Sequence, residues 1–151
     1  MTLKGSLFAG PERVIFGCGV VSNTGTYAAQ LGGKKVFLVA DKIIANIEAF
    51  KTVETSLKKK NIETYLYTES DVNPTDTQID RGCQIYKDEQ CDVIIGVGGG
   101  SNLDTAKSIG IIATNPGSIR DNFVENYVTN PYDTPNKNPT PPMIMIPTTA
   151  G

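Results

Sequence analysis

Continuous apolar runs alternate with amphipathic segments along most of this chain. Three of the runs, "KKVFLVAD" (34–41), "CDVIIGV" (91–97) and "MIMIP" (143–147), are apolar at successive positions rather than at every second position. A strand that is covered on both faces of a sheet has this unbroken pattern. We therefore expect these runs to be buried strands, with shorter strands at "ETYLY" (63–67) and at 13–16.

Between these runs, apolar residues recur at helical spacing. In the segment 47–60, Ile47, Phe50, Val53 and Leu57 fall three or four residues apart. Helices are expected over 22–31, 47–60, 76–89 and 101–113, with a short helix in 115–123 and a polar loop over 127–142. Strands that alternate with such helices predict βαβ units. The expected fold class is therefore α/β, a Rossmann-like parallel sheet flanked by helices.

The most distinctive polar and glycine residues fall just after the predicted strands. They are Asp41, Asn73 in the loop after 63–67, the segment 98–101, and Thr148 with Thr149. In an open α/β sheet, ligands bind beyond the carboxyl ends of the strands. Because four separate segments agree, we expect a binding site at this end of the sheet.

The sequence "GVGGGS" lies between an apolar run and a predicted helix. Gly98, Gly99, Gly100 and Ser101 come close to the dinucleotide-binding pattern G-x-G-x-x-G in the strand-to-helix context that it requires. A backbone without side chains allows its N–H groups to approach a pyrophosphate, and the positive end of the helix favours the negative charge. A tight turn is the alternative, but a turn needs only one glycine, and each glycine costs about 1 kcal/mol relative to alanine. The glycines therefore favour a phosphate or pyrophosphate site.

Ser101 and Asp104 also have a purely structural interpretation. They fit S-x-x-D, a variant of the capping box, with Ser101 as the N-cap. Lys107 lies three residues beyond Asp104 and can pair with it on the helix surface. Since a phosphate would repel Asp104, a functional Asp104 is expected to face a ribose or substrate hydroxyl instead.

Asp41 is the candidate for binding the adenosine ribose. A carboxylate at this position can accept hydrogen bonds from both ribose hydroxyls and repels a 2′-phosphate, which favours NAD over NADP. The alternative is that Asp41 caps the helix that follows it. A second candidate phosphate loop, Gly17-x-Gly19-x-x-Ser22, precedes a helix, but it ranks below the glycine triplet because its strand is shorter and more polar.

Composition narrows the function classes. With 151 residues, 39% of them hydrophobic and 20% charged, the chain is typical of one globular domain, and its net charge of −2 argues against a nucleic-acid surface. No apolar run approaches the roughly 20 residues that span a bilayer.

The kinds of reactive side chain narrow the picture further. Three cysteines without C-x-x-C spacing, and no signal peptide, indicate the cytoplasm. The chain has no histidine, which is both the commonest general acid or base and the commonest transition-metal ligand, so we expect it to be poorly equipped for metal-dependent chemistry alone.

The chain stops just after a strand of the buried type, at "PTTAG". Chain ends are usually exposed and polar. We therefore expect a longer protein.

Four segments resemble the iron-containing, or group III, alcohol dehydrogenases. "GGGSNLDTAK" (98–107) is similar to the signature GGGSxxDxAK of that family, and "IPTTAG" (146–151) is similar to the start of its second conserved block. "VNPT" (72–75) and "FGCG" (16–19) stand where the family has similar words. Sister families with the same fold, the glycerol dehydrogenases and dehydroquinate synthases, typically depart from serine at the position of Ser101.

The resemblance implies an oxidoreductase with two domains, of which this chain is the N-terminal nucleotide-binding one. An absent all-helical C-terminal domain would supply an aspartate and several histidines to Fe²⁺ or a related divalent metal, and the substrate would be an alcohol, aldehyde or ketone. In relatives, the residues that match Asp41, Asn73, Gly100, Ser101, Thr148 and Thr149 touch the dinucleotide. The chain alone, with no catalytic or metal-binding residue of its own, is then expected to be inactive. Its face toward the absent domain is expected to be apolar, so that the isolated chain self-associates, and a homo-oligomer is expected. A catalytically silent nucleotide-binding module, the same domain from an enzyme of the glycerol dehydrogenase type, and a protein that binds a phosphosugar or a flavin remain as alternatives.

Overall fold

The core of the molecule is a four-stranded parallel sheet. The computed structural model describes residues 10–70, 73–122 and 138–149. The strands are β1 (Lys35–Val39), β2 (Glu63–Tyr67), β3 (Val93–Gly98) and β4 (Met143–Pro147). Their order in the sheet is β2-β1-β3-β4, and each neighbouring pair is parallel. The expected α/β fold with a parallel sheet is confirmed.

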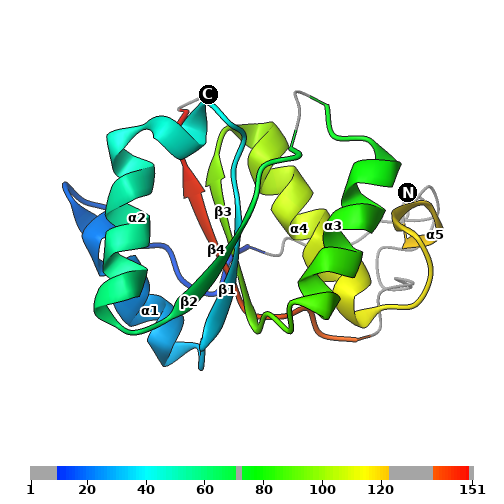
Figure 1. Cartoon of the computed structure of the whole chain (residues 1–151), viewed down its shortest axis with the longest axis horizontal. Helices are drawn as coiled ribbons and strands as arrows, with labels where there is room; N and C mark the ends of the chain where they lie inside the picture. Colours follow the sequence, from blue (N-terminus) through cyan, green and yellow to red (C-terminus); the bar gives the residue numbers. More distant parts are fainter. Residues whose placement is uncertain (1–9, 71–72, 123–137, 150–151) are drawn as a thin grey trace, which may run out of the picture.

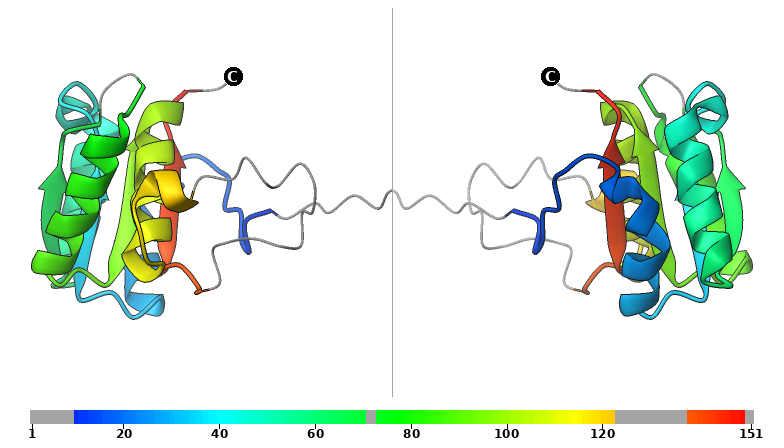
Figure 2. Two further views of the ribbon diagram at one scale, coloured as in Figure 1. Left: turned by 90° about the vertical axis from the view of Figure 1, so that its right-hand side faces the viewer. Right: turned by 90° about the vertical axis from the view of Figure 1, so that its left-hand side faces the viewer.

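Helices cover both faces of this sheet. They are α1 (Thr24–Gln30), α2 (Glu48–Lys59), α3 (Asp76–Asp88), α4 (Gly100–Thr114) and α5 (Ile119–Asn122), with the 3₁₀ turns η1 (Val20–Asn23) and η2 (Ile44–Asn46). In Figure 1, α1 and α2 cover one face, α3 and α4 cover the other, and α5 lies at the end of the α3–α4 layer. The side views in Figure 2 show the same three layers, with β4 at one edge of the sheet.

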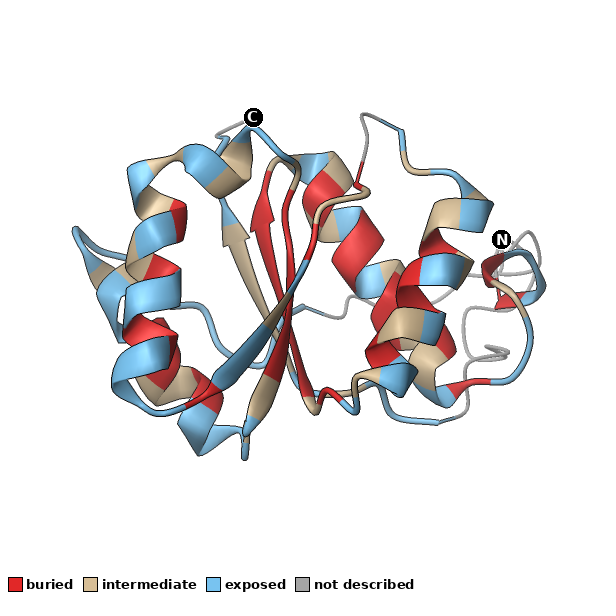
Figure 3. Cartoon of the chain, in the orientation of Figure 1, coloured by how far each residue is buried: buried red, intermediate tan, exposed pale blue. Residues whose placement is uncertain are grey.

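The unbroken apolar runs fill two cores, one on each face. Alternate residues of a strand point to opposite faces. Phe37 and Ile94 accordingly pack with Ile109 of α4 on one side. Leu38 and Ile95 belong to the core on the α1–α2 side. These side chains have no exposed surface, and Figure 3 shows the buried positions concentrated in the central strands and on the inner sides of the helices.

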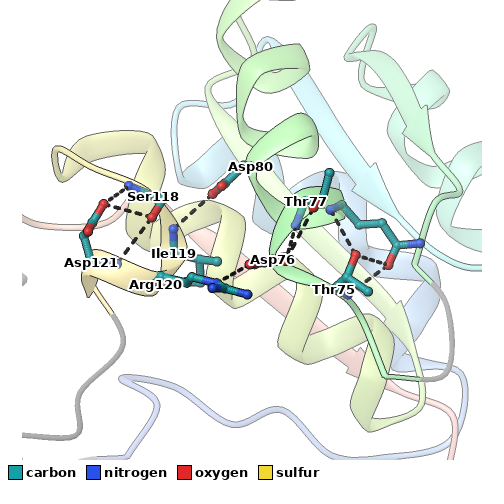
Figure 4. Close-up of polar contacts among 9 residues, drawn as sticks. Thr75, Asp76, Thr77, Asp80, Ser118, Ile119, Arg120 and Asp121 are labelled. Carbon is teal, nitrogen blue, oxygen red and sulfur yellow. Dashed lines mark hydrogen bonds and ion pairs between the residues drawn. The ribbon is translucent and has the colours of Figure 1, made fainter.

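Side chains at the start of α3 fix both that helix and α5. The Thr75 hydroxyl accepts a hydrogen bond from the Gln78 backbone N–H, and the Gln78 side chain accepts one from the Thr75 N–H, which together form a capping box. Asp80 Oδ1 accepts a hydrogen bond of 3.0 Å from the backbone N–H of Ile119, and Arg120 pairs with Asp76 (Figure 4). Helix α5 is therefore tied to α3 by side chains from the first two turns of α3.

Two sequence-based expectations about the elements are wrong. The segment 13–16 is not a strand, because no described strand pairs with it, and Val14 and Phe16 are 76% and 99% exposed. Helix α4 begins at Gly100, with Gly99 as its N-cap, rather than at Ser101. The other strands and helices lie within a few residues of their expected positions. Of the expected polar loop over 127–142, residues 127–137 lie outside the described part of the chain.

Among the described residues, every helix is too short or too polar to serve as a membrane span.

Candidate functional site

The carboxyl ends of β1, β3 and β4 meet at one end of the sheet, the upper end in Figure 1. The backbone N–H of Thr148, just after β4, donates a hydrogen bond of 2.9 Å to the carbonyl of Gly98 at the end of β3. A β-carbon placed on Gly99 would lie 3.6 Å from the Thr149 hydroxyl oxygen. Asp41, which follows β1, is bonded to Asn102 in the first turn of α4. The structure therefore brings three of the four predicted segments together.

Only one of the three consecutive glycines is required by the packing of the chain itself. Gly98 has φ +142°, and a β-carbon there would lie 2.0 Å from Asn102 Nδ2. At Gly99 an added β-carbon would make only ordinary contacts, and at Gly100 it would meet nothing within 4 Å. Gly99 also has an ordinary φ of −77°. Among the described residues, internal packing thus explains Gly98 and leaves the surface at Gly100 open, with Thr149 next to Gly99.

Unpaired backbone amides face this open surface. The first N–H groups of a helix have no partner within the helix. For Gly100, Ser101 and Asn102, no acceptor among the described residues takes the backbone N–H, and the first amide with a partner is Leu103, which donates to the Gly99 carbonyl at 3.2 Å. The positive end of the helix dipole lies at the same place. This is the arrangement in which helices bind phosphate groups.

The Asp41 carboxylate is held by three hydrogen bonds. Its Oδ1 accepts from the backbone N–H groups of Ile43 at 2.7 Å and Ile44 at 2.8 Å, and its Oδ2 accepts from Asn102 Nδ2 at 2.8 Å. Partial burial raises the pKa of Asp41, but the hydrogen bonds from Asn102, Ile44 and Ile43 outweigh it and hold the pKa below its ordinary value. Asp41 is therefore favoured as an anion. Its side chain bonds the turn before η2, but the N-cap of η2 is Ile43, not Asp41 as the structural alternative expected.

This bonding limits what Asp41 can offer to a ligand. An ionised carboxylate has about four acceptor sites, and three of those on Asp41 are taken, two on Oδ1 and one on Oδ2. No other described residue donates to Asp41, so one site remains, on Oδ2. In this arrangement Asp41 can accept one ribose hydroxyl, not the two that the sequence suggested.

Two residues of the site were missed by sequence reasoning. Asn102 and Ser70 are 3% and 2% exposed, and the Ser70 hydroxyl donates to Asn102 Oδ1. Ser70 follows β2, so the same strand-end rule that selected Asp41 would have selected it. Asn102 directly follows Ser101, but a polar residue in the first turn of a helix is usually exposed, and nothing in the sequence pattern indicates that this one is buried.

Ser101 and Asp104 do not form a capping box. Gly99 occupies the N-cap position with extended backbone, so Ser101 lies inside α4. The Ser101 carbonyl accepts a hydrogen bond of 2.8 Å from the Thr105 hydroxyl. The expected ion pair is present, with Lys107 Nζ 2.7 Å from Asp104 Oδ1. The Asp104 side chain is 65% exposed, one turn into the helix from the amides.

Two further candidates lie apart from the amides. Asn73 is exposed, with φ +82°, in the loop between β2 and α3, and no hydrogen bond connects it to the glycine loop among the described residues. The alternative phosphate loop around Gly17 and Gly19 has no strand before it within the described residues. The Gly19 carbonyl is occupied by the Ser22 hydroxyl at 2.8 Å and by the Ser22 N–H at 3.0 Å. The strand-to-helix context of a phosphate loop is therefore met at Gly98–Ser101 and not at this second loop.

Comparison with known proteins gives a consistent family. Residues 11–151 match the family described as iron-containing alcohol dehydrogenase. The chain is 38% identical to choline dehydrogenase of Bacillus subtilis over 141 residues. The aligned segment covers 93% of this chain and 34% of that protein. It is 33% identical to NAD-dependent methanol dehydrogenase of Bacillus methanolicus, again over 93% of this chain and 35% of the relative.

A solved structure agrees with this result. The fold is similar to the crystal structure of a 1,3-propanediol oxidoreductase, with a TM-score of 0.82 and 35% identity, over 93% of this chain and 35% of that one. The chain thus spans about a third of the length of these relatives. Sequence match, fold and the glycine loop before α4 agree, and the chain belongs to the iron-containing alcohol dehydrogenase family.

Proposed function

We propose that residues 1–151 are the NAD-binding α/β domain of a metal-dependent alcohol dehydrogenase. The whole enzyme interconverts an alcohol and the corresponding aldehyde or ketone by transferring hydride to or from the nicotinamide. The observation that carries the proposal is the start of α4, where three backbone N–H groups have no acceptor among the described residues and the surface at Gly100 is open. Membership of the family, and a relative named as NAD-dependent, support NAD as the dinucleotide.

The pyrophosphate is assigned to the glycine loop. Gly100 leaves room for its oxygens, and the backbone N–H groups of Gly100 and Ser101 have no acceptor among the described residues. The exposed Thr148 and Thr149 follow β4 beside this loop, and their hydroxyls can donate to the same phosphates. Gly98 contributes indirectly, because its missing side chain makes room for Asn102.

The adenosine ribose is assigned to Asp41. Its remaining acceptor site on Oδ2 suits one ribose hydroxyl, while its negative charge disfavours the 2′-phosphate of NADP. Asn73 and Asp104 are proposed to contact parts of the dinucleotide or substrate farther from the glycine loop. Asp104 would face a hydroxyl there, because a phosphate would repel its carboxylate.

Iron or another divalent metal is part of the proposal, with ligands outside these residues. The sequence has no histidine, and no group of three or more Cys, Asp and Glu side chains in the described ranges is placed to hold a metal ion. A helical part of a longer enzyme is proposed to hold the metal and one wall of the substrate site, in keeping with the length of the relatives. Such a metal polarises the alcohol or carbonyl oxygen. The three free cysteines, two of them buried, support a cytoplasmic location.

Calorimetric titration of the chain with NAD, NADP and FMN tests the binding proposal. Gly100→Val fills the open position without an internal clash, so we expect at least tenfold weaker NAD binding with unchanged thermal stability. Gly32→Asn is the matched control, because Gly32 is equally open, lies before β1 at the opposite end of the sheet, and has φ +85°, which asparagine tolerates. Asp41→Gly should weaken NAD binding and reduce the preference over NADP. Equal NAD affinity in the Gly100→Val variant would contradict the proposed pyrophosphate site.

The chain by itself is expected to oxidise no alcohol. Purified protein with NAD, an alcohol and added Fe²⁺ or Zn²⁺ should produce no NADH above the buffer rate. Metal-dependent NADH formation would show that the catalytic metal site lies within these 151 residues.

A further inference from the structure

A buried asparagine lies beneath the proposed cofactor site and uses both ends of its amide. Asn102 Nδ2 donates to Asp41 Oδ2 at 2.8 Å, and Asn102 Oδ1 accepts from the Ser70 hydroxyl. Buried polar groups need such partners, since an unpaired one carries its full desolvation penalty. One side chain on α4 thereby connects the loop after β1 with the loop after β2.

The partners allow only one orientation of this amide. The Asp41 carboxylate can only accept, so it requires the NH₂ group, while the Ser70 hydroxyl donates to the carbonyl oxygen. The backbone adapts to the amide, since a β-carbon on Gly98 would lie 2.0 Å from Nδ2 and 2.8 Å from Cγ. A side chain that is bonded at both ends and given space by a glycine is held in a fixed position.

We propose that Asn102 is a positioning residue for the dinucleotide, holding the Asp41 carboxylate so that one acceptor site on Oδ2 faces the ribose. The inference rests on the proposed NAD site. The Asn102 side chain touches no ligand in this scheme and acts through Asp41. Ser70 supports it from the other side by fixing the amide orientation.

The test is a double-mutant cycle on NAD affinity, measured by calorimetry with the full chain. Asn102→Ala removes the hydrogen bond to a charged group, and NAD binding is expected to weaken about tenfold. In the Asp41→Ala background, adding Asn102→Ala should change the NAD affinity less than about twofold, because Asn102 then has no carboxylate to position. Equal effects in the two backgrounds would overturn the positioning role and leave only a contribution to folding.

The matched control is Asn115→Ala. Asn115 is also a buried asparagine, 3% exposed, with an amide that is hydrogen-bonded at the opposite end of α4. Loss of the Asn115 amide should lower the melting temperature about as much as Asn102→Ala does, and should leave the NAD affinity unchanged. A similar loss of affinity in both variants would mean that Asn102 acts through general stability, which overturns the inference.

Exchanging the two side chains separates folding from binding. In the variant Asp41→Asn/Asn102→Asp, the amide introduced at position 41 can still donate to the carboxylate at position 102, so the melting temperature should recover relative to Asn102→Asp alone. NAD affinity should not recover, because the negative charge has moved away from the ribose. Full recovery of NAD affinity would overturn the role assigned to the Asp41 carboxylate.

Ser70→Ala provides an answer even if the Asn102 variants do not fold. This change leaves Asn102 in place but releases one end of its amide, and NAD binding should weaken about threefold. If the unmodified chain binds no NAD, both the proposed function and this inference fail. If it binds NAD and only Gly100→Val weakens binding, the proposed function stands and the inference about Asn102 fails.

Discussion

At the scale of single residues, the glycine triplet serves two purposes. Gly98 has a positive φ and makes room for the Asn102 amide, whereas none of the described residues would contact a β-carbon at position 100. The sequence predicted the triplet as a unit, because three glycines exceed what a turn requires. It did not predict the division between them, because that depends on a side chain that folds back onto the loop from within the helix.

Asp41 is expected to stabilise the fold in a pH-dependent way. Its pKa in the folded chain lies below its ordinary value, so its ionised form is favoured by folding. The resulting stabilisation is fully present above the unfolded pKa of about 3.9 and is lost as the pH falls through the lower folded pKa. Asp41→Asn should therefore lower the urea midpoint at pH 7 and lower it progressively less below about pH 4. A difference in midpoint that stays constant from about pH 7 to about pH 3 would contradict this.

At the scale of elements, the hydrophobic pattern was sufficient to predict the strands and helices that pack on each other. β1 and β3 were predicted from continuous apolar runs, because both their faces are covered. The pattern failed at 13–16, since apolar residues indicate a strand only where another strand pairs with them. It also misplaced the first residue of α4, because serine is the commoner N-cap and only the backbone shows that Gly99 has that position.

Helix α5 offers a test of how α3 holds its neighbour. Asp80→Ala removes the acceptor for the Ile119 N–H and should destabilise the chain by about 1 kcal/mol, measured by urea unfolding. Asp80→Asn is the control, since its side-chain oxygen can still accept this bond. Arg120→Ala breaks the ion pair between Arg120 and Asp76. Because the Arg120 side chain is 81% exposed, this change should alter the stability little. A larger loss in Arg120→Ala than in Asp80→Ala would show that the ion pair, not the bond to the backbone, holds α5.

At the scale of the whole molecule, a cluster of apolar side chains is open to solvent. Val14, Ile15 and Phe16 are 76%, 41% and 99% exposed, and Figure 2 shows their segment, in blue, on the β4 side of the layers. The family resemblance predicts an apolar face toward the absent domain. The exposure of 13–16 was not predicted, because this segment has the composition of a buried strand.

These side chains should cause the chain to self-associate. Sedimentation velocity is expected to show a sedimentation coefficient that rises with concentration, because association buries the apolar surface. Val14→Ser/Phe16→Ser should abolish that rise. Leu31→Ser, at a position 43% exposed on the far end of α1, is the control and should leave it unchanged. Equal association of the double variant and the unmodified chain would place the contact elsewhere.

The fit between Gly98 and Asn102 has a consequence for how this site can evolve. Replacing Asn102 by a smaller residue would remove the amide that a β-carbon at position 98 would meet at 2.0 Å. The backbone at Gly98 would still keep its φ of +142°, which other residues rarely adopt. Mutations at the two positions are therefore tolerated in a fixed order. Drift can begin at position 102 while the glycine persists, and lineages that lose the amide should still carry the glycine that once accommodated it.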